Sequence, residues 1–211
     1  MILLVTPDRY GQYSDELAQM YRLRYRVFKK RLGWDVESSG GVEIDVFDAL
    51  HPVYLLQRAD DSGRIQGCVR LLPSTGPTML SETFTALLDG GAVPADPAVW
   101  ESSRFALDVG WGDSSRARGL ARATYELLAG MIEFSLSRRL TGIVTVTELR
   151  MERILRRAGW PLQRLGRPTP VGGALMLAGR LEVSRASLAR VRRGGGLQGP
   201  VLRAPAGLAT A

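Results

Sequence analysis

The sequence has few of the residues on which several kinds of site depend. Its 211 residues include one cysteine, Cys68, and one histidine, His51. A single cysteine cannot form an internal disulfide, which fits a reducing compartment. A single histidine, without a cluster of acidic or sulfur side chains at ligand spacing, disfavours a metal site. We therefore expect no metal, and a structural role for His51.

Long apolar runs are lacking as well. No run approaches the roughly 20 residues that cross a bilayer. The apolar start of the chain lacks the basic leader of a secretory signal. We therefore expect a cytoplasmic protein that does not enter a membrane. The 211 residues, 45% of them hydrophobic, are enough for one globular domain with a core.

Acidic residues are scarce in the last third of the chain. Residues 138–211 contain 14 arginines and 3 glutamates, a net charge of +11, whereas residues 1–137 contain 14 Lys or Arg and 18 Asp or Glu, a net charge of −4. A basic region favours an acidic partner, which can be a nucleic acid or an acidic carrier protein. A solvated basic surface without a partner explains the same composition.

The apolar periodicity predicts strands and helices that alternate along the chain. The predicted strands are 2–6, 53–58, 65–72, 99–109, 142–147 and 173–183. The predicted helices are 15–30, 114–138, 148–157 and 184–193, with a short one at 84–88, and residues 31–50 are expected to be a loop. This order favours a mixed α/β sheet with helices on both faces. From Gly194 on, Gly, Pro and Ala predominate, and we expect this tail to pack little.

Two groups of residues in the first fifty have the chemistry of a binding site. Arg24 and Phe28 are four apart and share a helix face, and Trp34 follows. An arginine beside aromatic rings suits a carboxylate next to an apolar or cationic group. The pair Asp45 and Asp48 suits a cationic ligand or a basic side chain. An amphipathic helix with core aromatics and a solvated acidic loop are the alternatives.

Two strands carry charges that need partners. Arg70 lies within an apolar strand, and burying it unpaired would be costly, so Glu101 or an aspartate of the acidic loop is its expected partner. On the next strand, Glu101 and Ser103 share one face and Arg104 takes the other, unless a bulge re-aims them. A structural ion pair and a strand with edge charges are the alternatives.

In combination, these residues resemble a known family. The strings RYRVF…GW (24–34), D-x-x-D (45–48), R-L-L-P (70–73) and W-E-x-S-R-F (100–105), together with residues 145–161, match those of LuxI-type acyl-homoserine-lactone synthases in order and spacing. The resemblance covers about residues 1–183, the expected catalytic domain, and leaves 184–211 as a short basic helix and a tail. It implies a GNAT-like (acyltransferase-like) three-layer α-β-α fold with a mixed, splayed central sheet. It also implies acyl transfer to S-adenosylmethionine, lactone formation and release of methylthioadenosine, without a prosthetic group.

The resemblance further implies a role for each matching position. The catalytic set is Glu101, the base, with Arg104 and Arg70. S-adenosylmethionine is expected to bind at Arg24, Phe28, Trp34, Asp45, Asp48, Arg104 and Phe105. The acyl chain is expected to lie among Phe84, Thr145, Met79, Met151, Leu155 and Met176, for most of which an ordinary core position is the alternative. Thr145 stands where makers of 3-oxo-acyl signals often carry threonine.

Two further features bear on the acyl donor. Four arginines on one short helix form the expected docking surface for an acidic acyl carrier protein: Arg150, Arg153, Arg156 and Arg157. In contrast, Arg116, Gly119 and Ala121 match the R-x-x-G-x-A loop with which GNAT enzymes hold the pyrophosphate of coenzyme A at a helix N-terminus. An acyl carrier protein and acyl-coenzyme A therefore both stand as donors.

Two other functions fit part of the sequence. A generic GNAT-type N-acyltransferase that uses acyl-coenzyme A explains the fold and the Gly119 loop, but it does not explain the set of Arg24, Trp34, Asp45, Asp48 and Arg104. A basic nucleic-acid-binding module explains the arginines, but the sequence lacks a binding motif and its first part is acidic. We therefore expect no nucleic-acid partner.

Overall fold

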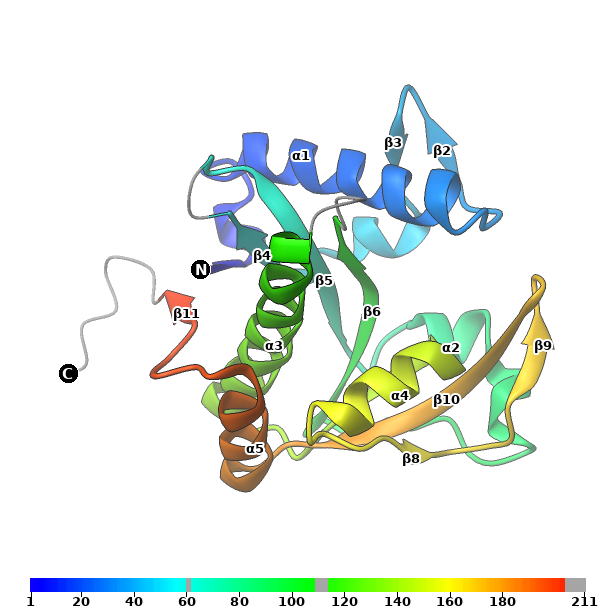
Figure 1. Ribbon diagram of the computed structural model, residues 1–211. Helices are drawn as coiled ribbons and strands as arrows, with labels where there is room; N and C mark the ends of the chain where they lie inside the picture. Colours follow the sequence, from blue (N-terminus) through cyan, green and yellow to red (C-terminus); the bar gives the residue numbers. More distant parts are fainter. Residues whose placement is uncertain (60–61, 109–113, 204–211) are drawn as a thin grey trace.

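A single twisted sheet organises the molecule (Figure 1). The computed structural model describes residues 1–59, 62–108 and 114–203, except for the side chains of 114–121. Within these residues the sheet has nine strands, in the order β11-β1-β4-β5-β6-β7-β10-β8, with β9 paired to β10. Its long strands are β1 (Ile2–Val5), β4 (Val53–Arg58), β5 (Ile65–Pro73), β6 (Val99–Leu107), β7 (Gly142–Glu148) and β10 (Ala174–Glu182).

Short strands complete the edges of this sheet. They are β8 (Gln163–Arg164), β9 (Thr169–Val171) and β11 (Leu202–Arg203). The pairs β1–β11 and β6–β7 are parallel, and the other neighbours are antiparallel. The predicted mixed sheet is therefore confirmed, and the consecutive strands β4 and β5 pair as a hairpin.

One face of the sheet, here called the α3 face, is covered by three helices. They are α3 (Ser114–Ser137), α4 (Leu149–Arg157) and α5 (Arg185–Gly195). Residues of α3 such as Leu127 and Phe134 pack in one apolar cluster with Leu155 of α4 and Val191 of α5. Because side chains alternate along a strand, the other residues of these strands face the opposite side.

The opposite face, here called the α1 face, is covered in two separate parts. Over β1, β4 and β5 lie α1 (Ser14–Arg24) and the π-helix η2 (Tyr25–Arg31), which enclose one apolar cluster. Over β7 and β10 lie α2 (Met79–Glu82) and the 3-10 helix η4 (Thr85–Leu88), which enclose another. Polar and charged side chains, described in the next subsection, lie between these two clusters.

Several predicted elements are refined by the structure. The helix expected at 15–30 is continuous, but its second half is π-helical, with seven residues in η2. The expected loop at 31–50 is wrong in part, because it contains a hairpin of β2 (Ser38–Ser39) and β3 (Val42–Glu43) and the 3-10 helix η3 (Val46–Leu50). A further 3-10 turn, η1 (Pro7–Arg9), follows β1. None of the described helices combines the length and apolar character needed to span a membrane.

The prediction that the chain packs little beyond Gly194 is wrong for residues 197–203. Leu197 is buried, and β11 pairs with the edge of β1. Glu133 of α3 accepts hydrogen bonds from the backbone N–H groups of Val201 and Leu202 at 3.0 Å. The Gly, Pro and Ala content of the tail did not indicate this packing, because backbone groups and three apolar side chains, Leu197, Val201 and Leu202, make it. The remainder of the tail, 204–211, lies outside the described residues.

Candidate functional site

Six charged side chains from five elements meet on the α1 face, and we call them the charge cluster. They are Arg24 (α1), Glu43 (β3), Asp45 and Asp48 (at the start of η3), Arg70 (β5) and Arg104 (β6). Three guanidinium groups therefore face three carboxylates, and the formal charge of the cluster is zero. Sequence positions up to 80 residues apart meet here because α1, η3 and two strands pack against one another.

Arg24 is at the centre of the charge cluster and has no exposed surface. Its Nη1 and Nη2 donate to the two carboxylate oxygens of Asp48 at 2.8 and 2.9 Å, and its Nε donates to Glu43. Burial disfavours the charge of Arg24, but the two carboxylates outweigh burial and raise its pKa above the ordinary value. All three nitrogens of Arg24 are thus committed to the protein.

Asp45 and Asp48 start η3 by capping each other. The side chain of Asp45 accepts from the N–H of Phe47 at 3.0 Å, and the side chain of Asp48 accepts from the N–H of Asp45 at 2.9 Å. Tyr54 on β4 donates its hydroxyl to Asp48 at 2.6 Å. Burial would raise the pKa of Asp48, but Arg24 holds it well below the usual range. The acidic pair is therefore not a solvated loop, because its carboxylates orient both η3 and the arginines.

Arg70 and Arg104 complete the cluster and keep free donors. Arg70 donates from Nη1 to both Asp45 and Asp48. Its Nε donates to the hydroxyl of Ser103 at 3.0 Å. Its Nη2 is buried and has no hydrogen-bond partner. Arg104 donates from Nε to Glu43 at 2.9 Å and lies 2.7 Å from Asp45 through Nη2. Of the two predicted partners of Arg70, the acidic loop is correct and Glu101 makes no ion pair with it among the described residues.

A bulge between β5 and β6 decides the direction of Arg104. The strand register shifts between Cys68 and Arg70, and Arg104 has a left-handed φ of 55°. A non-glycine residue there costs about 1–2 kcal/mol. The bulge turns Arg104 into the charge cluster, so of the two alternatives from the sequence the bulge is correct, and plain alternation, with Arg104 on the face opposite Ser103, is not. Both side chains contact the same cluster.

Glu101 lies beside the cluster on the α1 face, with 1% of its surface exposed. Its two carboxylate oxygens accept from the backbone N–H groups of Met79 and Leu80, at 3.0 and 2.8 Å. Burial raises the pKa of Glu101, although these hydrogen bonds offset part of the rise. The same contact places the side chain of Met79 against Arg104, whose Nη1 is 3.2 Å from the Met79 sulfur.

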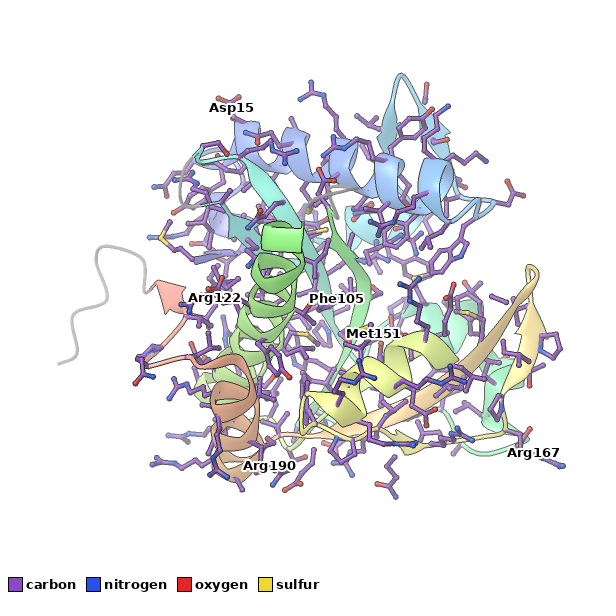
Figure 2. All side chains as sticks on the ribbon, viewed as in Figure 1. Asp15, Phe105, Arg122, Met151, Arg167 and Arg190 are labelled. Atoms are coloured by element: carbon purple, nitrogen blue, oxygen red, sulfur yellow. The ribbon has the colours of Figure 1, made fainter. Side chains whose placement is uncertain are left out.

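The predicted aromatic residues do not all meet. Phe28 and Trp34 stack with ring centroids 5.2 Å apart, and the guanidinium of Arg104 lies 5.5 Å from the Phe28 centroid. Phe105 instead packs with the cluster on the α3 face, as does Met151 of α4 (Figure 2). Phe105 therefore does not share a pocket with Phe28 and Trp34 in this structure, because the bulge at Arg104 turns the next residue to the opposite side of the sheet.

The six predicted acyl-chain residues are likewise divided between the faces. Phe84 and Met176 pack together near α2 on the α1 face, whereas Met151 and Leu155 pack on the α3 face. Thr145 lies on β7, and its hydroxyl donates to the carbonyl of Ser102 at 2.9 Å. Met79, described above, borders the charge cluster. A single wall made of all six does not form.

Two neighbouring strands separate next to these residues. The parallel pairing of β6 with β7 runs from Val99 and Gly142 to Ser102 and Thr145 and then ends, although both strands continue. Figure 1 shows β6 leaving the direction of β10, the partner of β7. The predicted splayed sheet is thus present. Glu101 and Ser103 flank the point of separation on one side, and Thr145 flanks it on the other.

The helix α4 presents the predicted basic surface. Its four arginines are exposed, as is the apolar Ile154 on the same helix: Arg150, Arg153, Arg156 and Arg157. Its acid, Glu152, points inward and receives both Nε and Nη2 of Arg164 at 2.8 Å. The three residues of the predicted coenzyme A loop, Arg116, Gly119 and Ala121, lie in α3 but outside the described side chains.

Sequence reasoning missed Glu43 and Tyr54. Glu43 contacts two arginines of the cluster, and Tyr54 supplies a neutral donor to Asp48. Glu43 precedes Asp45 by two residues, which is the available signal, whereas nothing in the strand around Tyr54 marks it. Among the described residues, no group of three or more His, Cys, Asp or Glu side chains is placed to hold a metal ion.

Comparison with known proteins identifies close relatives. The family model described as "Autoinducer synthase" matches residues 8–191. An acyl-homoserine-lactone synthase of Agrobacterium fabrum is 50% identical over 190 residues, which cover 90% of each chain. The crystal structure of the synthase LasI is 34% identical, with a TM-score of 0.81 over 92% of this chain and 95% of LasI.

A further solved relative contains ligands. The coenzyme A-dependent synthase BjaI, solved with S-adenosylmethionine and isopentyl-CoA, is 28% identical, with a TM-score of 0.84 over 96% of this chain and 92% of BjaI. N-acyltransferase-like structures at 16% and 13% identity share the fold alone. The GNAT-like fold class is thereby confirmed.

Proposed function

Because this chain belongs to the autoinducer synthase family, we propose a division of its reaction between the two faces of the sheet. The chain is an acyl-homoserine-lactone synthase, which makes a quorum-sensing signal from S-adenosylmethionine and an acyl donor. Two bonds form: the amine attacks the acyl carbonyl and displaces the thiol of the donor, and the methionyl carboxylate then closes on its own γ-carbon and expels methylthioadenosine. The site must therefore hold a carboxylate, accept a proton from an amine and admit an acyl thioester.

The methionyl carboxylate binds at Arg70 and Arg104. Arg24 is fully buried and each of its three nitrogens already donates to a carboxylate, so none of its nitrogens lacks a partner. Arg70 retains Nη2 and Arg104 retains Nη1, whose partner is only the weak acceptor sulfur of Met79. A carboxylate that accepts from these two nitrogens would supply the missing partner of Arg70. The role of Arg24 is then to orient Asp48.

The sulfonium is held by a ring and not by net negative charge. Asp45 and Asp48 are neutralised by the arginines, so the cluster as a whole does not attract a cation. Trp34 is the less buried ring of the stacked pair, and aromatic faces bind cations with about 0.5–2 kcal/mol. We therefore assign the adenosyl sulfonium to the exposed side of Trp34.

Glu101 accepts the proton of the amine. An α-amine has a pKa of about 8 and a glutamate about 4.3, a gap of roughly 5 kcal/mol for an unassisted transfer. Burial raises the pKa of Glu101 and narrows this gap. Each carboxylate oxygen accepts one backbone N–H and keeps a second lone pair, so the group can accept a proton while it holds Met79 and Leu80.

The thioester reaches Glu101 through the separation of β6 and β7. The donor approaches from the α3 face, where α4 lies, and the amine is bound on the α1 face. The two substrates therefore meet at the gap between the strands after Ser102 and Thr145. The hydroxyl of Thr145 already donates to Ser102. A 3-oxo group must compete for that proton, whereas a hydroxyl on the acyl chain can donate to the Thr145 oxygen without breaking the existing bond.

An acyl carrier protein docks on α4. Four exposed arginines and the exposed Ile154 form a basic helix surface, which suits an acidic helix of a partner protein better than a compact pyrophosphate. Coenzyme A is the second donor, because the Gly119 loop matches the pyrophosphate motif and the relative BjaI is coenzyme A-dependent. Parallel assays with the same acyl group on carrier protein and on coenzyme A distinguish the two by kcat/KM.

The convergence of the charge cluster beside the buried Glu101 carries this assignment, and Glu101→Gln tests it. We expect kcat to fall by about 10²–10⁴ with little change in the KM for S-adenosylmethionine, measured by release of methylthioadenosine and by mass spectrometry of the lactone. Glu148→Gln, at the end of β7, is the matched control and should retain kcat. A kcat within a factor of two of the parent would remove Glu101 from the role of base.

A further inference from the structure

A cavity of about 270 Å³ opens at the end of the sheet, outside the site described above. It lies where β1 and β5 end and where β4 and β6 begin. Val53 and Leu71, both buried, form its floor, and Trp100 contributes a half-buried ring. Ordinary small-molecule pockets have volumes of about 300–1,000 Å³. This cavity is slightly smaller and therefore suits a small ligand.

Charges of opposite sign line the rim of this cavity. Asp8 of η1 and Arg138, which follows α3, are both exposed and both line it. Among the described residues neither forms an ion pair, and the guanidinium of Arg138 instead lies 5.7 Å from the ring centroid of Phe134. Hydrogen bonding with the Thr6 side chain, and to a smaller extent the charge of Arg138, lowers the pKa of Asp8. The cavity thus has one anionic and one cationic group that the protein does not neutralise by direct contact.

We propose that this cavity binds a small zwitterion, an α-amino acid with an apolar side chain. Its ammonium group would face Asp8, its carboxylate would face Arg138, and its side chain would pack on Val53, Leu71 and Trp100. A simple anion would meet the repulsion of Asp8, and a simple cation that of Arg138. A ligand with both charges and an apolar end uses every part of the lining.

One wall of the cavity connects it to the synthase site. Leu50, His51 and Pro52 line it, and His51 ends η3 with a left-handed φ of 54°. The ring of His51 stacks on Tyr10, with centroids 6.5 Å apart. Because η3 begins with the capping pair Asp45 and Asp48, a ligand in the cavity braces the far end of the segment that orients the arginines.

Isothermal titration calorimetry on the whole chain tests the proposal with three probes that share one carbon skeleton. L-leucine carries both charges, 4-methylpentanoate lacks the ammonium group and 3-methylbutylamine lacks the carboxylate. We expect L-leucine to bind with one-to-one stoichiometry and each analogue to bind about tenfold or more weakly. Absence of L-leucine binding at millimolar concentration, or equal affinity for an analogue, would overturn the proposal.

Substitutions at the rim locate the binding. Asp8→Asn and Arg138→Gln should each weaken L-leucine about tenfold or more, whereas Arg139→Gln, an exposed neighbour that does not line the cavity, should not. Thermal unfolding of each variant, measured without ligand, verifies that the fold is retained. Binding that survives both rim substitutions would place L-leucine elsewhere and contradict the assignment.

Discussion

Two groups of arginines in this molecule have the same side chain and opposite surroundings. The three arginines of the charge cluster have side-chain exposures of 0–8% and face three carboxylates, whereas the four outward-facing arginines of α4 lie in solvent. Desolvation makes the buried charges depend on their partners, while water solvates the exposed ones, of which Arg156 lies 3.6 Å from Glu152. Arginine content therefore indicates nothing about role until burial and partners are known.

The largest expected effect is on the buried side of this comparison. Arg24→Met leaves Glu43 and Asp48 without their main cation, and removing one partner of a buried ion pair costs about 3–5 kcal/mol. Urea unfolding should show a loss of that size for Arg24→Met and a change within about 0.5 kcal/mol for the exposed Arg153→Gln. Equal stabilities of the two variants would contradict the contrast.

Acid should unfold the protein through the charge cluster. The pKa of Asp48 is lowered in the folded state, so its stabilising contribution is present above the unfolded value of about 3.9 and is lost as pH falls below it. Glu101 has the opposite sign: its raised pKa means a contribution that is lost as pH rises past about 4.3.

The acid sensitivity can be assigned to one residue. Asp48→Asn should lower stability at neutral pH and flatten the decline of unfolding free energy between about pH 4 and pH 2. Denaturant titrations at fixed pH values measure this slope, and Asp89→Asn, on the surface near Arg167, is the control. A slope as steep in Asp48→Asn as in the parent would show that other carboxylates control acid unfolding.

A smaller effect on the unfolding free energy is expected for the ion pair of Glu152 and Arg164, which joins a buried side chain to a solvent-exposed one. Glu152 is nearly buried, but Arg164 keeps 43% of its side chain exposed, so solvent screens the pair. Glu152→Gln should lower the unfolding free energy by about 1 kcal/mol or less. A loss comparable with that of Arg24→Met would mean that this pair behaves as a buried one.

The smallest effect per residue is expected on the exposed face of α4. Arg153→Gln and Arg157→Gln should each raise the KM for acyl carrier protein by a few fold, about 0.5–1 kcal/mol, and leave the KM for S-adenosylmethionine unchanged. The same KM should rise with salt, because exposed charges are screened beyond about 8–10 Å at physiological ionic strength. A salt-independent KM for the carrier would contradict docking on this helix.

The sequence predicted which residues form the site more accurately than it predicted their contacts. Arg24, Asp48, Arg70 and Arg104 converge as expected from the resemblance, because packing of α1, β5 and β6 brings them together. The partners could not be read from spacing: Glu43, which was missed, binds two of these arginines. Pairing depends on distances between elements far apart in the chain.

The backbone irregularities were beyond the sequence pattern as well. Simple alternation placed Arg104 on the wrong side, because one left-handed residue in a bulge reverses the direction of a side chain. Plain alternation would place Phe105 on the face of Glu101 and Ser103, and the same bulge turns it to the α3 face, away from Phe28. Residue type favours a kind of contact but does not determine the face on which it occurs.

The apolar periodicity and the charges of the sequence by themselves determined the order of strands and helices and the basic character of residues 138–211. They also determined most of the polar residues that form the site. Only the tertiary structure decided which arginines are buried against carboxylates and which are solvated. It also decided where β6 separates from β7. The physical reason is that apolar periodicity acts between near neighbours, whereas desolvation and ion pairing depend on the whole surroundings of a side chain. Those surroundings exist only once the sheet has formed.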